Sequence, residues 1–596
     1  MVPRAEALRS LPAATEPSSG TVNSAVLDLP ETPGSDSRGY ARRMRHMTRI
    51  LGCGLVALLA ACGSSKGSGP GQQAQAPVGT SLEDAAGCYL VLQGTSPGLA
   101  IKSTLLVPGG PLDGEMLIDG TGKITCVAAS CSGSAGYEGV TQLACTSAVV
   151  APGFINAHDH TTYDFTPPAS DSHGNTRYQH RNEWRTGADG MTALPEMPAT
   201  TDAKMLAAIE LRFVMSGVTS IVSSGGSPGL ARNLAAYNDT TWLEGLTGKV
   251  VYFDTFPLGD ENGTILTSGC NYPSVISKSS AFEDGVFAPH FAEGINPGAE
   301  NELVCANTSA MGLLTSNTAV LHAVGTNAQD VANIAAAGAS VVWAPRSNIS
   351  LYGNTMPVTE MKYAGVPIAL GTDWLPSGSM NMLRELQCAE QLNTKYFAST
   401  FQDEDLVDMA TSVAAKEMGF DDQIGTIAVG KLADVVVFAA SGAKDFSVPI
   451  NAASEDVALV LRGGTPLYGD QLLVQAAGGA STCAQMTMCG VSKSVCLDVP
   501  GVALSDVQAA ATSSYPLFFC GGQVPTGEPT CVPYRDSYPN GTSATDQDGD
   551  GVPDATDDCP TIFNPPRSMD NGAQSDVDGD GYGDACDAKP LDASGH

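Results

Sequence analysis

The sequence predicts an α/β protein built on a (β/α)8 TIM-like barrel, with a composite β-sandwich domain from both flanks and a small acidic C-terminal module. Three observations support this prediction. Between residues 151 and 420, apolar runs of strand length alternate with Ala-rich stretches of helical length, a pattern typical of parallel strands with crossover helices. Short β-like runs flank this region on both sides, and an Asp/Gly repeat follows them.

Length and composition set the first bounds on function. The chain has 596 residues, 43% of them hydrophobic, so a sizeable core and roughly two to four domains are expected. A formal net charge of −33 argues against nucleic acid as a partner, because its phosphates carry the same sign. Sixteen cysteines favour an exported protein with disulfides, whose connectivity the spacing leaves open.

Residues 1–62 are predicted to be a leader followed by a lipoprotein signal peptide. Residues 1–43 show no periodic apolar pattern, and a basic stretch then precedes a short apolar run, which makes Met44 or Met47 the expected start. Leu59-Ala60-Ala61-Cys62 resembles a bacterial lipobox. We therefore expect export, lipidation at Cys62 and anchoring to the outer membrane, on its periplasmic or surface face. An ordinary cleaved signal peptide or a buried apolar segment is the alternative.

The remaining chain divides by changes of pattern. Residues 63–86 are rich in Gly, Ser, Gln and Pro, which is typical of a flexible linker. Residues 87–150 and 421–512 carry short β-like runs and are expected to form the two parts of one composite β-domain around the barrel of 151–420. A Cys/Pro/Gly-rich linker, 513–545, then leads to the acidic repeats of 546–587 and a tail, 588–596.

Within the barrel region, six strands are clear from their apolar runs. They are expected at Val218–Val222, Val250–Phe253, Val286–Pro289, Ala319–His322, Ser340–Ala344 and Pro367–Gly371, after a first strand that ends near His160. Helices are expected at Asp202–Ser216 and Asp330–Ala337. The stretch from Gly229 to Phe282 leaves the third and fourth strands ambiguous.

Polar residues follow these apolar runs at the positions where a barrel of this type carries its chemistry. His158 and His160 end the first strand and project to the same face, because side chains alternate along a strand. His290, His322 and Asp373 end three later strands. Taken singly, His322 is more often a core histidine and Asp373 a helix N-cap. Together, three histidines and a carboxylate suit a divalent metal such as zinc, and Glu293 is placed to move a proton.

Several motifs carry a resemblance to a known family. They are Pro152-Gly-Phe-Ile-Asn-Ala-His-Asp-His160, His290-Phe-Ala-Glu293, Leu321-His322, Trp343-Ala-Pro-Arg-Ser-Asn348 and Ala369-Leu-Gly-Thr-Asp373. In this order they resemble the amidohydrolase superfamily, most closely its mononuclear branch with cytosine deaminase, guanine deaminase and chlorohydrolase-like enzymes. The similarity covers about residues 88–470.

The resemblance implies a role for each matched residue. One Zn²⁺ or Fe²⁺ per barrel would be bound by His158, His160, His290 and Asp373. Glu293 would shuttle a proton, His322 would polarise the substrate or position the water, and Asp373 would also act as a base. No lysine follows a convincing strand end, which favours one metal over the two that a carboxylated lysine bridges in many members.

Substrate contacts are expected from loops at the same end of the barrel. The long loop from Thr161 to Gly190 is charged and aromatic and leaves the first strand towards the active face. Alternatively, this loop extends over the protein surface without contacting a ligand. The candidate substrate-binding residues are His180, Trp184, Arg346, Asn348 and Trp374.

The C-terminal repeats place Asp at every second position, with Gly where the backbone must turn sharply. This pattern brings oxygen ligands together around Ca²⁺. With the neighbouring cysteines it resembles a thrombospondin type 3 repeat. A disordered acidic tail is the alternative, but it does not explain the Gly and Cys placement. The expected calcium-binding residues are Asp546, Asp548, Asp550, Asp554, Asp576, Asp578, Asp580 and Asp584.

The sequence therefore predicts an exported, lipid-anchored hydrolase with a metal-activated water and a calcium-stabilised C-terminal module. Its expected reaction is hydrolysis of a C–N bond, by deamination or ring opening, in a small cyclic amide, amidine or amino-heterocycle. A dechlorinase or an acyclic amide hydrolase on the same site is one alternative. A non-catalytic, calcium-stabilised surface or adhesion lipoprotein is another, and homo-oligomerisation stays open.

Overall fold

The computed structural model describes residues 80–81, 86–168, 174–235, 240–479 and 483–595. These residues belong to one compact unit, Ala74–His596. The predicted leader, the lipidation residue Cys62 and nearly all of the predicted linker lie outside the described residues. Within the described part of the chain, no helix combines the length and the apolar character needed to cross a membrane.

Eight parallel strands form a closed barrel in the order of the sequence. Hydrogen bonds from Leu234 to Ile221 and from Val251 to Leu234 join its two sheets on one side, and a parallel bridge between Asp159 and Asp373 closes it on the other. The strands are β7 (Phe154–Asp159), β8 (Val218–Ser223), β9 (Arg232–Asn233), β10 (Val250–Asp254), β11 (Gly285–Phe291), β12 (Ala319–His322), β13 (Ser340–Trp343) and β14 (Ile368–Leu370). The ambiguous third strand is only two residues long, too short for any apolar periodicity to reveal it.

The barrel strands are apolar on both faces because both faces are covered. Small and branched side chains such as Ala157, Val251 and Leu321 fill the interior, whereas alternate residues such as Phe154 and Phe287 pack outward in the cluster that includes the surrounding helices. Burial on both faces is the physical reason that these strands read as continuous apolar runs.

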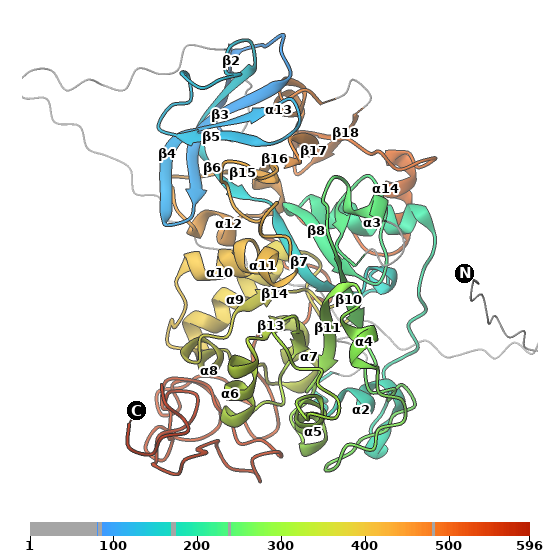
Figure 1. Ribbon diagram of the computed structural model, residues 1–596, viewed down its shortest axis with the longest axis vertical. Helices are drawn as coiled ribbons and strands as arrows, with labels where there is room; N and C mark the ends of the chain where they lie inside the picture. Colours follow the sequence, from blue (N-terminus) through green and yellow to red (C-terminus); the bar gives the residue numbers. More distant parts are fainter. Residues whose placement is uncertain (1–79, 82–85, 169–173, 236–239, 480–482, 596) are drawn as a thin grey trace, which may run out of the picture. The chain divides into compact units, whose positions relative to one another are not determined.

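Helices connect successive strands on the outside of the barrel (Figure 1). The predicted helices are present, and each begins at a side-chain cap: Asp202 accepts from two backbone N–H groups, and Asn327 forms a capping box with Asp330. The helices of this region are α2 (Arg181–Thr186), α3 (Ala203–Val214), α4 (Lys278–Ala281), α5 (Pro297–Ala306), α6 (Ala328–Ala337), α7 (Pro345–Tyr352), α8 (Val358–Tyr363), α9 (Met382–Tyr396), α10 (Asp403–Met409) and α11 (Ser412–Glu417).

Both flanks of the barrel contribute to one sheet, as predicted. The long strand β6 from the N-terminal flank pairs antiparallel with β15 from the C-terminal flank, Val150 facing Val437, and Figure 1 shows the cyan β6 beside the orange strands of the C-terminal flank. Its strands are β1 (Thr80–Ser81), β2 (Cys88–Leu92), β3 (Gly98–Val107), β4 (Gly110–Asp119), β5 (Ile124–Ala128), β6 (Thr141–Pro152), β15 (Val435–Ala439), β16 (Val457–Arg462), β17 (Thr465–Asp470), β18 (Ala484–Met488) and β19 (Val491–Val495).

The prediction of a β-sandwich was wrong in one respect. Among the described residues, the eleven strands form a single hydrogen-bonded sheet instead of two separate sheets. Strand β6 spans 12 residues and pairs with β2, β3 and β15, so it joins strands that a sandwich would divide. In the predicted C-terminal part of this domain, residues 421–512, the first strand, β15, begins only at Val435.

The predicted linker, residues 513–545, packs on the barrel although it holds no helix or strand beyond the last residue of α14 (Leu504–Ser513). A disulfide joins Cys531 to Cys388 in α9. Helices α12 (Ser447–Asn451) and α13 (Gln471–Ala476) precede residues 513–545 in the chain. Seven disulfides take up all cysteines of the described residues: 88–145, 126–131, 270–305, 388–531, 483–496, 489–520 and 559–586.

Candidate metal centre and active-site cavity

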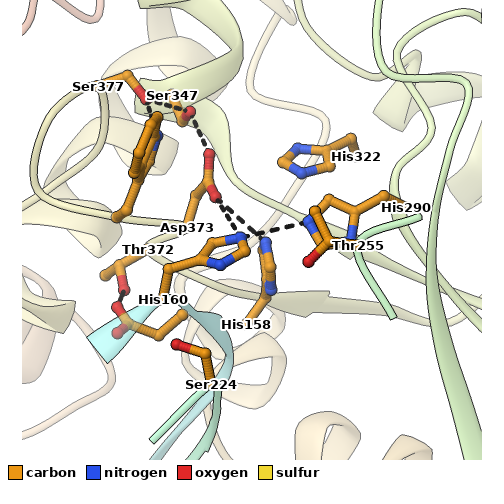
Figure 2. A network of polar contacts seen from close by, with 12 residues as sticks. His158, His160, Ser224, Thr255, His290, His322, Ser347, Thr372, Asp373 and Ser377 are labelled. Carbon is orange, nitrogen blue, oxygen red and sulfur yellow. Dashed lines mark hydrogen bonds and ion pairs between the residues drawn. The ribbon is translucent and has the colours of Figure 1, made fainter. Parts of the chain in front are cut away.

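The ends of β7, β11, β12 and β14 bring five predicted side chains to one point of the barrel. Nε2 of His158 lies 3.2 Å from Oδ1 of Asp373, and Nε2 of His160 lies 3.6 Å from the same oxygen. The Nε2 atoms of His160 and His290 lie 3.3 Å apart. Figure 2 shows these side chains converging, with His322 beside them.

These donor atoms fit a divalent cation. His158 is 1% exposed, yet neither of its ring nitrogens makes a hydrogen bond. Burial lowers the pKa of His158 and of His160 to about 3 and that of His290 well below its usual value. The imidazoles are therefore uncharged at neutral pH, and their lone pairs and one carboxylate surround a common point. This donor set is the kind that binds Zn²⁺ or Fe²⁺.

Hydrogen bonds to the rear of the rings fix which nitrogen faces that point. The backbone oxygen of Asp254 lies 3.0 Å from Nδ1 of His290, so Nδ1 carries the proton and Nε2 is free to act as a ligand. The amide nitrogen of Asn348 lies 3.2 Å from Nδ1 of His322, so there the proton is on Nε2. His290 therefore presents a lone pair at Nε2, whereas His322, which lies in the same cluster, presents an N–H there.

The backbone at the site is held in conformations that cost energy. His322 and Asp373 have φ values of 69° and 64°, a region that side chains other than Gly adopt at a cost of about 1–3 kcal/mol each and mostly at functional sites. Asp373 donates its N–H to the oxygen of His158 and accepts from His160. A Cβ on Gly371 would lie 2.7 Å from the Cβ of His158, so only glycine lets β14 approach β7 here.

Asp159 points away from the metal point, as the alternation along β7 predicts. Its carboxylate accepts hydrogen bonds from Thr372 and Thr161, at 2.7 and 3.0 Å, and Asn156 donates to Thr372 at 2.6 Å. This buried network ties the end of β7 to the residue before Asp373 and so supports the site from below.

Glu293 lies beside the metal point and is 3% exposed. Its Oε1 accepts a hydrogen bond of 2.7 Å from the hydroxyl of Tyr352, and its Oε2 lies 3.8 Å from Nε2 of His322. Burial raises the pKa of Glu293 above its ordinary value. A carboxyl group of raised pKa next to a reaction point is suited to carry a proton.

A cavity of about 460 Å³ opens over these side chains. Two of the predicted substrate-binding residues, Trp184 and Trp374, line it, and their rings lie 5.4 Å apart. The lining residues are His160, Thr162, Tyr163, Arg181, Trp184, Arg185, Ser224, Thr255, Phe256, His290, Glu293, His322, Asp373 and Trp374.

The other three predicted substrate-binding residues have different roles in the structure. His180 is buried as the N-cap of α2, where its Nδ1 accepts from the N–H of Asn182. Arg346 donates to the backbone oxygens of Pro529 and Arg384, outside the cavity. Asn348 contacts His322 from behind. Their types and loop positions suggested ligand contact, but each is used to hold another part of the chain.

Some cavity residues were missed by the sequence prediction. Tyr163 follows His160 by three residues, and its position after the His-x-His pair is a signal that could have found it. Arg181 and Arg185 lie in the loop that was expected to contact the substrate, but neither was singled out, and Phe256 carries no such signal. Arg185 of α2 lies over the ring of Phe256, in the loop after β10, at 4.1 Å, so the contact joins segments that are far apart in the sequence.

The acidic repeats form two clusters of carboxylates. Asp546, Asp548 and Asp550 make the first, and Asp576, Asp578 and Asp580 make the second. Burial, together with the neighbouring carboxylates, raises the pKa of Asp548 to about 8 and that of Asp550 to about 7.

Two of the predicted calcium ligands lie apart from these clusters. Asp554 accepts hydrogen bonds from Gln547, and Asp584 accepts from Val577 and Ser575, so both close their own loops. Asp557 and Asp587, three residues further on in each repeat, each have a buried carboxylate oxygen without a hydrogen-bond partner. They stand at position 12 of loops that start at 546 and 576, where a calcium loop places its last acidic ligand.

Comparison with known proteins places this geometry in context. The amidohydrolase family pattern matches residues 298–467. A 5-methylthioadenosine/S-adenosylhomocysteine deaminase of Teredinibacter turnerae is 39% identical over 129 residues, 21% of this chain and 29% of that protein. A deaminase of the same name from Moorella thermoacetica is 25% identical over 372 residues, 57% of this chain and 85% of that protein.

Among solved structures, a triazine hydrolase variant has a TM-score of 0.51 and 16% identity, covering 70% of this chain and 99% of that one. At this identity the likeness concerns the fold, and it agrees with the barrel described above. The chain spans about a third of the length of the first curated relatives that it matches. The part of the chain that matches the amidohydrolase family pattern includes His322 and Asp373.

Proposed function

We propose that the protein is a metal-dependent hydrolase that acts on a C–N bond and deaminates a small amino-heterocycle. The observation that carries this proposal is the convergence of His158, His160, His290 and Asp373 beside Glu293 and His322, at the floor of one cavity. The names of the deaminase relatives favour deamination over ring opening.

The chain's own residues supply the proton chemistry of this reaction. A bound Zn²⁺ or Fe²⁺ supplies a water of lowered pKa as the nucleophile near neutral pH. Asp373 lies beside the histidines and is the base that accepts a proton from that water. Oε1 of Glu293 is occupied by Tyr352, so Oε2 is the atom that takes a proton and returns it to the leaving amine. Nε2–H of His322 donates to the ring nitrogen of the substrate.

The cavity favours a flat ring as the substrate. Trp184 and Trp374 lie 5.4 Å apart, and Tyr163 lies 6.4 Å from Trp374. Aromatic faces of this kind stack on heterocycles. A volume of about 460 Å³ leaves room for a substituent on the ring. An adenine-type base with a sugar-like substituent satisfies both properties, and it is the class named by the relatives.

Ammonia release tests the proposal. Protein from Gly63 onward, reconstituted with Zn²⁺ or Fe²⁺, should bind about one such ion per chain and release ammonia from aminopurines or their nucleosides. His158→Ala should lose the metal, whereas Glu293→Gln should keep the metal and lose more than a hundredfold in kcat, since proton transfer contributes about 10²–10⁴-fold. Absence of a transition metal after reconstitution would refute the proposal. Ammonia release by His158→Ala at the wild-type rate would refute it as well.

We further propose that the two acidic clusters bind Ca²⁺ and that Asp557 and Asp587 complete their ligand sets. The support is the buried carboxylate oxygens at positions 3 and 12 of the loops, in Asp548, Asp557, Asp578 and Asp587, which make no hydrogen bond among the described residues. Each site should stabilise the protein by about 2.7 kcal/mol at a free calcium concentration 100 times its Kd. The melting temperature should therefore fall in EGTA and recover with CaCl₂ but not with MgCl₂. Equal melting temperatures in EGTA and CaCl₂ would contradict this.

We propose export and a lipid anchor at Cys62, as the leader pattern indicates. Seven disulfides support an oxidising compartment. Metabolic labelling with a radioactive fatty acid should mark the wild-type protein in bacterial membranes and should not mark Cys62→Ala. Equal labelling of both would exclude this anchor.

A further inference from the structure

Tyr352, the last residue of α7, is fully buried and connects two parts of the site. Its hydroxyl donates to Oε1 of Glu293 at 2.7 Å and accepts from the indole N–H of Trp184 at 2.9 Å. Trp184 belongs to α2 and lines the cavity. The hydroxyl thus lies between the residue that moves the proton and a residue of the cavity wall.

The backbone at Tyr352 is held by the C-terminal strap, which we define as residues 528–538. The guanidinium of Arg535 donates to the backbone oxygen of Tyr352 at 2.6 Å and to that of Tyr178 at 3.1 Å. The hydroxyl of Tyr538 donates to the oxygen of Gly353 at 3.3 Å. Gly353 has a φ of 68°, and a Cβ there would lie 2.1 Å from the oxygen of Tyr534. The close approach of the strap therefore requires glycine.

The other end of α7 is held by the same strap. Arg346, at the start of α7, donates to the backbone oxygen of Pro529, and Arg384 of α9 pairs with Glu528. The disulfide between Cys388 and Cys531 fixes the strap to α9 covalently. Helix α7 is therefore fixed at both ends by a segment that lies about 180 residues later in the chain.

We propose that Tyr352 is a positioning residue for proton transfer and that the C-terminal strap holds it in place. The inference rests on the proposed function. Tyr352 orients the carboxylate of Glu293 so that Oε2 faces the reacting atoms, and it couples this orientation to the cavity wall through Trp184. Because Tyr352 lies at the junction of α7 and the strap, loosening the strap displaces the hydroxyl that Glu293 depends on.

Tyr352→Phe removes only the hydroxyl and tests the first half of the proposal. Because the variant loses a hydrogen bond to a charged group, its kcat should fall by about ten- to a hundredfold. The KM should stay within about twofold and the metal content unchanged, because Tyr352 does not line the cavity. Adding Tyr352→Phe to Glu293→Gln should have little further effect, since it acts through Glu293. Tyr515→Phe is the matched control, because the hydroxyl of Tyr515 donates to Thr526 instead.

A purely structural role would give a different pattern. A kcat of Tyr352→Phe equal to that of Tyr515→Phe would overturn the positioning role. An undiminished additional loss in the Glu293→Gln background would also overturn it, because the hydroxyl would then act independently of Glu293.

Fluorine NMR tests the strap without any substrate. The chain has four tryptophans, so labelling with 5-fluorotryptophan gives four resonances, and Trp184→Phe assigns one of them. Tyr352→Phe, Arg535→Ala and the milder Tyr538→Phe should each shift the Trp184 resonance. Lys204→Ala, which removes an exposed ion pair with Asp506 outside the strap, should leave it in place.

The two experiments separate the inference from the proposed function. If the wild-type protein releases ammonia from no substrate, the proposed function fails, and the fluorine spectra then decide the coupling alone. A Trp184 resonance that is unchanged in both Arg535→Ala and Tyr538→Phe, with melting temperatures showing that the variants are folded, would overturn the role of the strap. A shift in either folded variant supports it.

Discussion

Replacement of Ser347 by alanine should weaken the metal site without touching any ligand. Ser347 is fully buried in α7, and its hydroxyl donates to Oδ2 of Asp373 at 2.5 Å. Behind it, the hydroxyl of Ser377 lies 2.8 Å from that of Ser347 and accepts from the indole of Trp374. The chain of donors ends on the carboxylate, so it fixes the orientation in which Oδ1 faces the histidines (Figure 2).

The size of the effect follows from this contact. A hydrogen bond to a charged group contributes about 1.5–3 kcal/mol, and about 1.4 kcal/mol corresponds to a tenfold change in affinity. Ser347→Ala should therefore bind Zn²⁺ about ten- to a hundredfold more weakly, in agreement with other contacts that orient metal ligands. Ser377→Ala should weaken binding less, because Ser347 still donates to Asp373.

Competition with a chelator of known zinc affinity, read out by elemental analysis, measures both variants. Circular dichroism spectra and melting temperatures in the presence of zinc show whether the variants are folded. The reasoning would be refuted by Ser347→Ala binding Zn²⁺ within threefold of the wild type. It would also be refuted by Ser377→Ala being the weaker binder of the two.

Three further predictions follow from other contacts. Burial raises the pKa of Glu360 to about 8, so the folded state holds a proton that the unfolded chain releases near pH 4.5, and stability falls as pH rises through this window. Glu360→Gln should therefore exceed the wild type in free energy of unfolding by a few kcal/mol at pH 8 and match it at pH 4. Urea titrations that show no such pH-dependent gain would contradict this. Cys388→Ser together with Cys531→Ser should lower the melting temperature of the oxidised protein, because a disulfide closing a long loop contributes about 2–5 kcal/mol; an unchanged midpoint in scanning calorimetry would show that the strap is held by its other contacts. Trp374→Ala should raise the KM for an aminopurine about tenfold with a smaller change in kcat, because it removes one aromatic face of the cavity. An unchanged KM in steady-state kinetics would show that the substrate does not stack on Trp374.

Much of the barrel could be predicted from the sequence because its strands are buried on both faces. In runs such as Ala319–His322, apolar residues are followed by a final polar one, which marks both the strand and its carboxyl end. β9 was not predicted because it is only two residues long and both of them, Arg232 and Asn233, are polar. The β-sandwich prediction was wrong because alternation shows which residues are buried but not which strands pair.

The sequence by itself determined where the metal-ligating side chains stand, since parallel strands in a closed barrel bring their carboxyl ends together whatever the loops do. Only the tertiary structure decided which residues hold those side chains in position. Ser347 and Tyr352 meet Asp373 and Glu293 across 26 and 59 residues of chain, and Arg535 meets Tyr352 across 183. Such contacts depend on the path of loops that have no periodic pattern. The free energy that fixes this path comes from packing and disulfides distributed over the whole chain, so no local stretch of sequence records it.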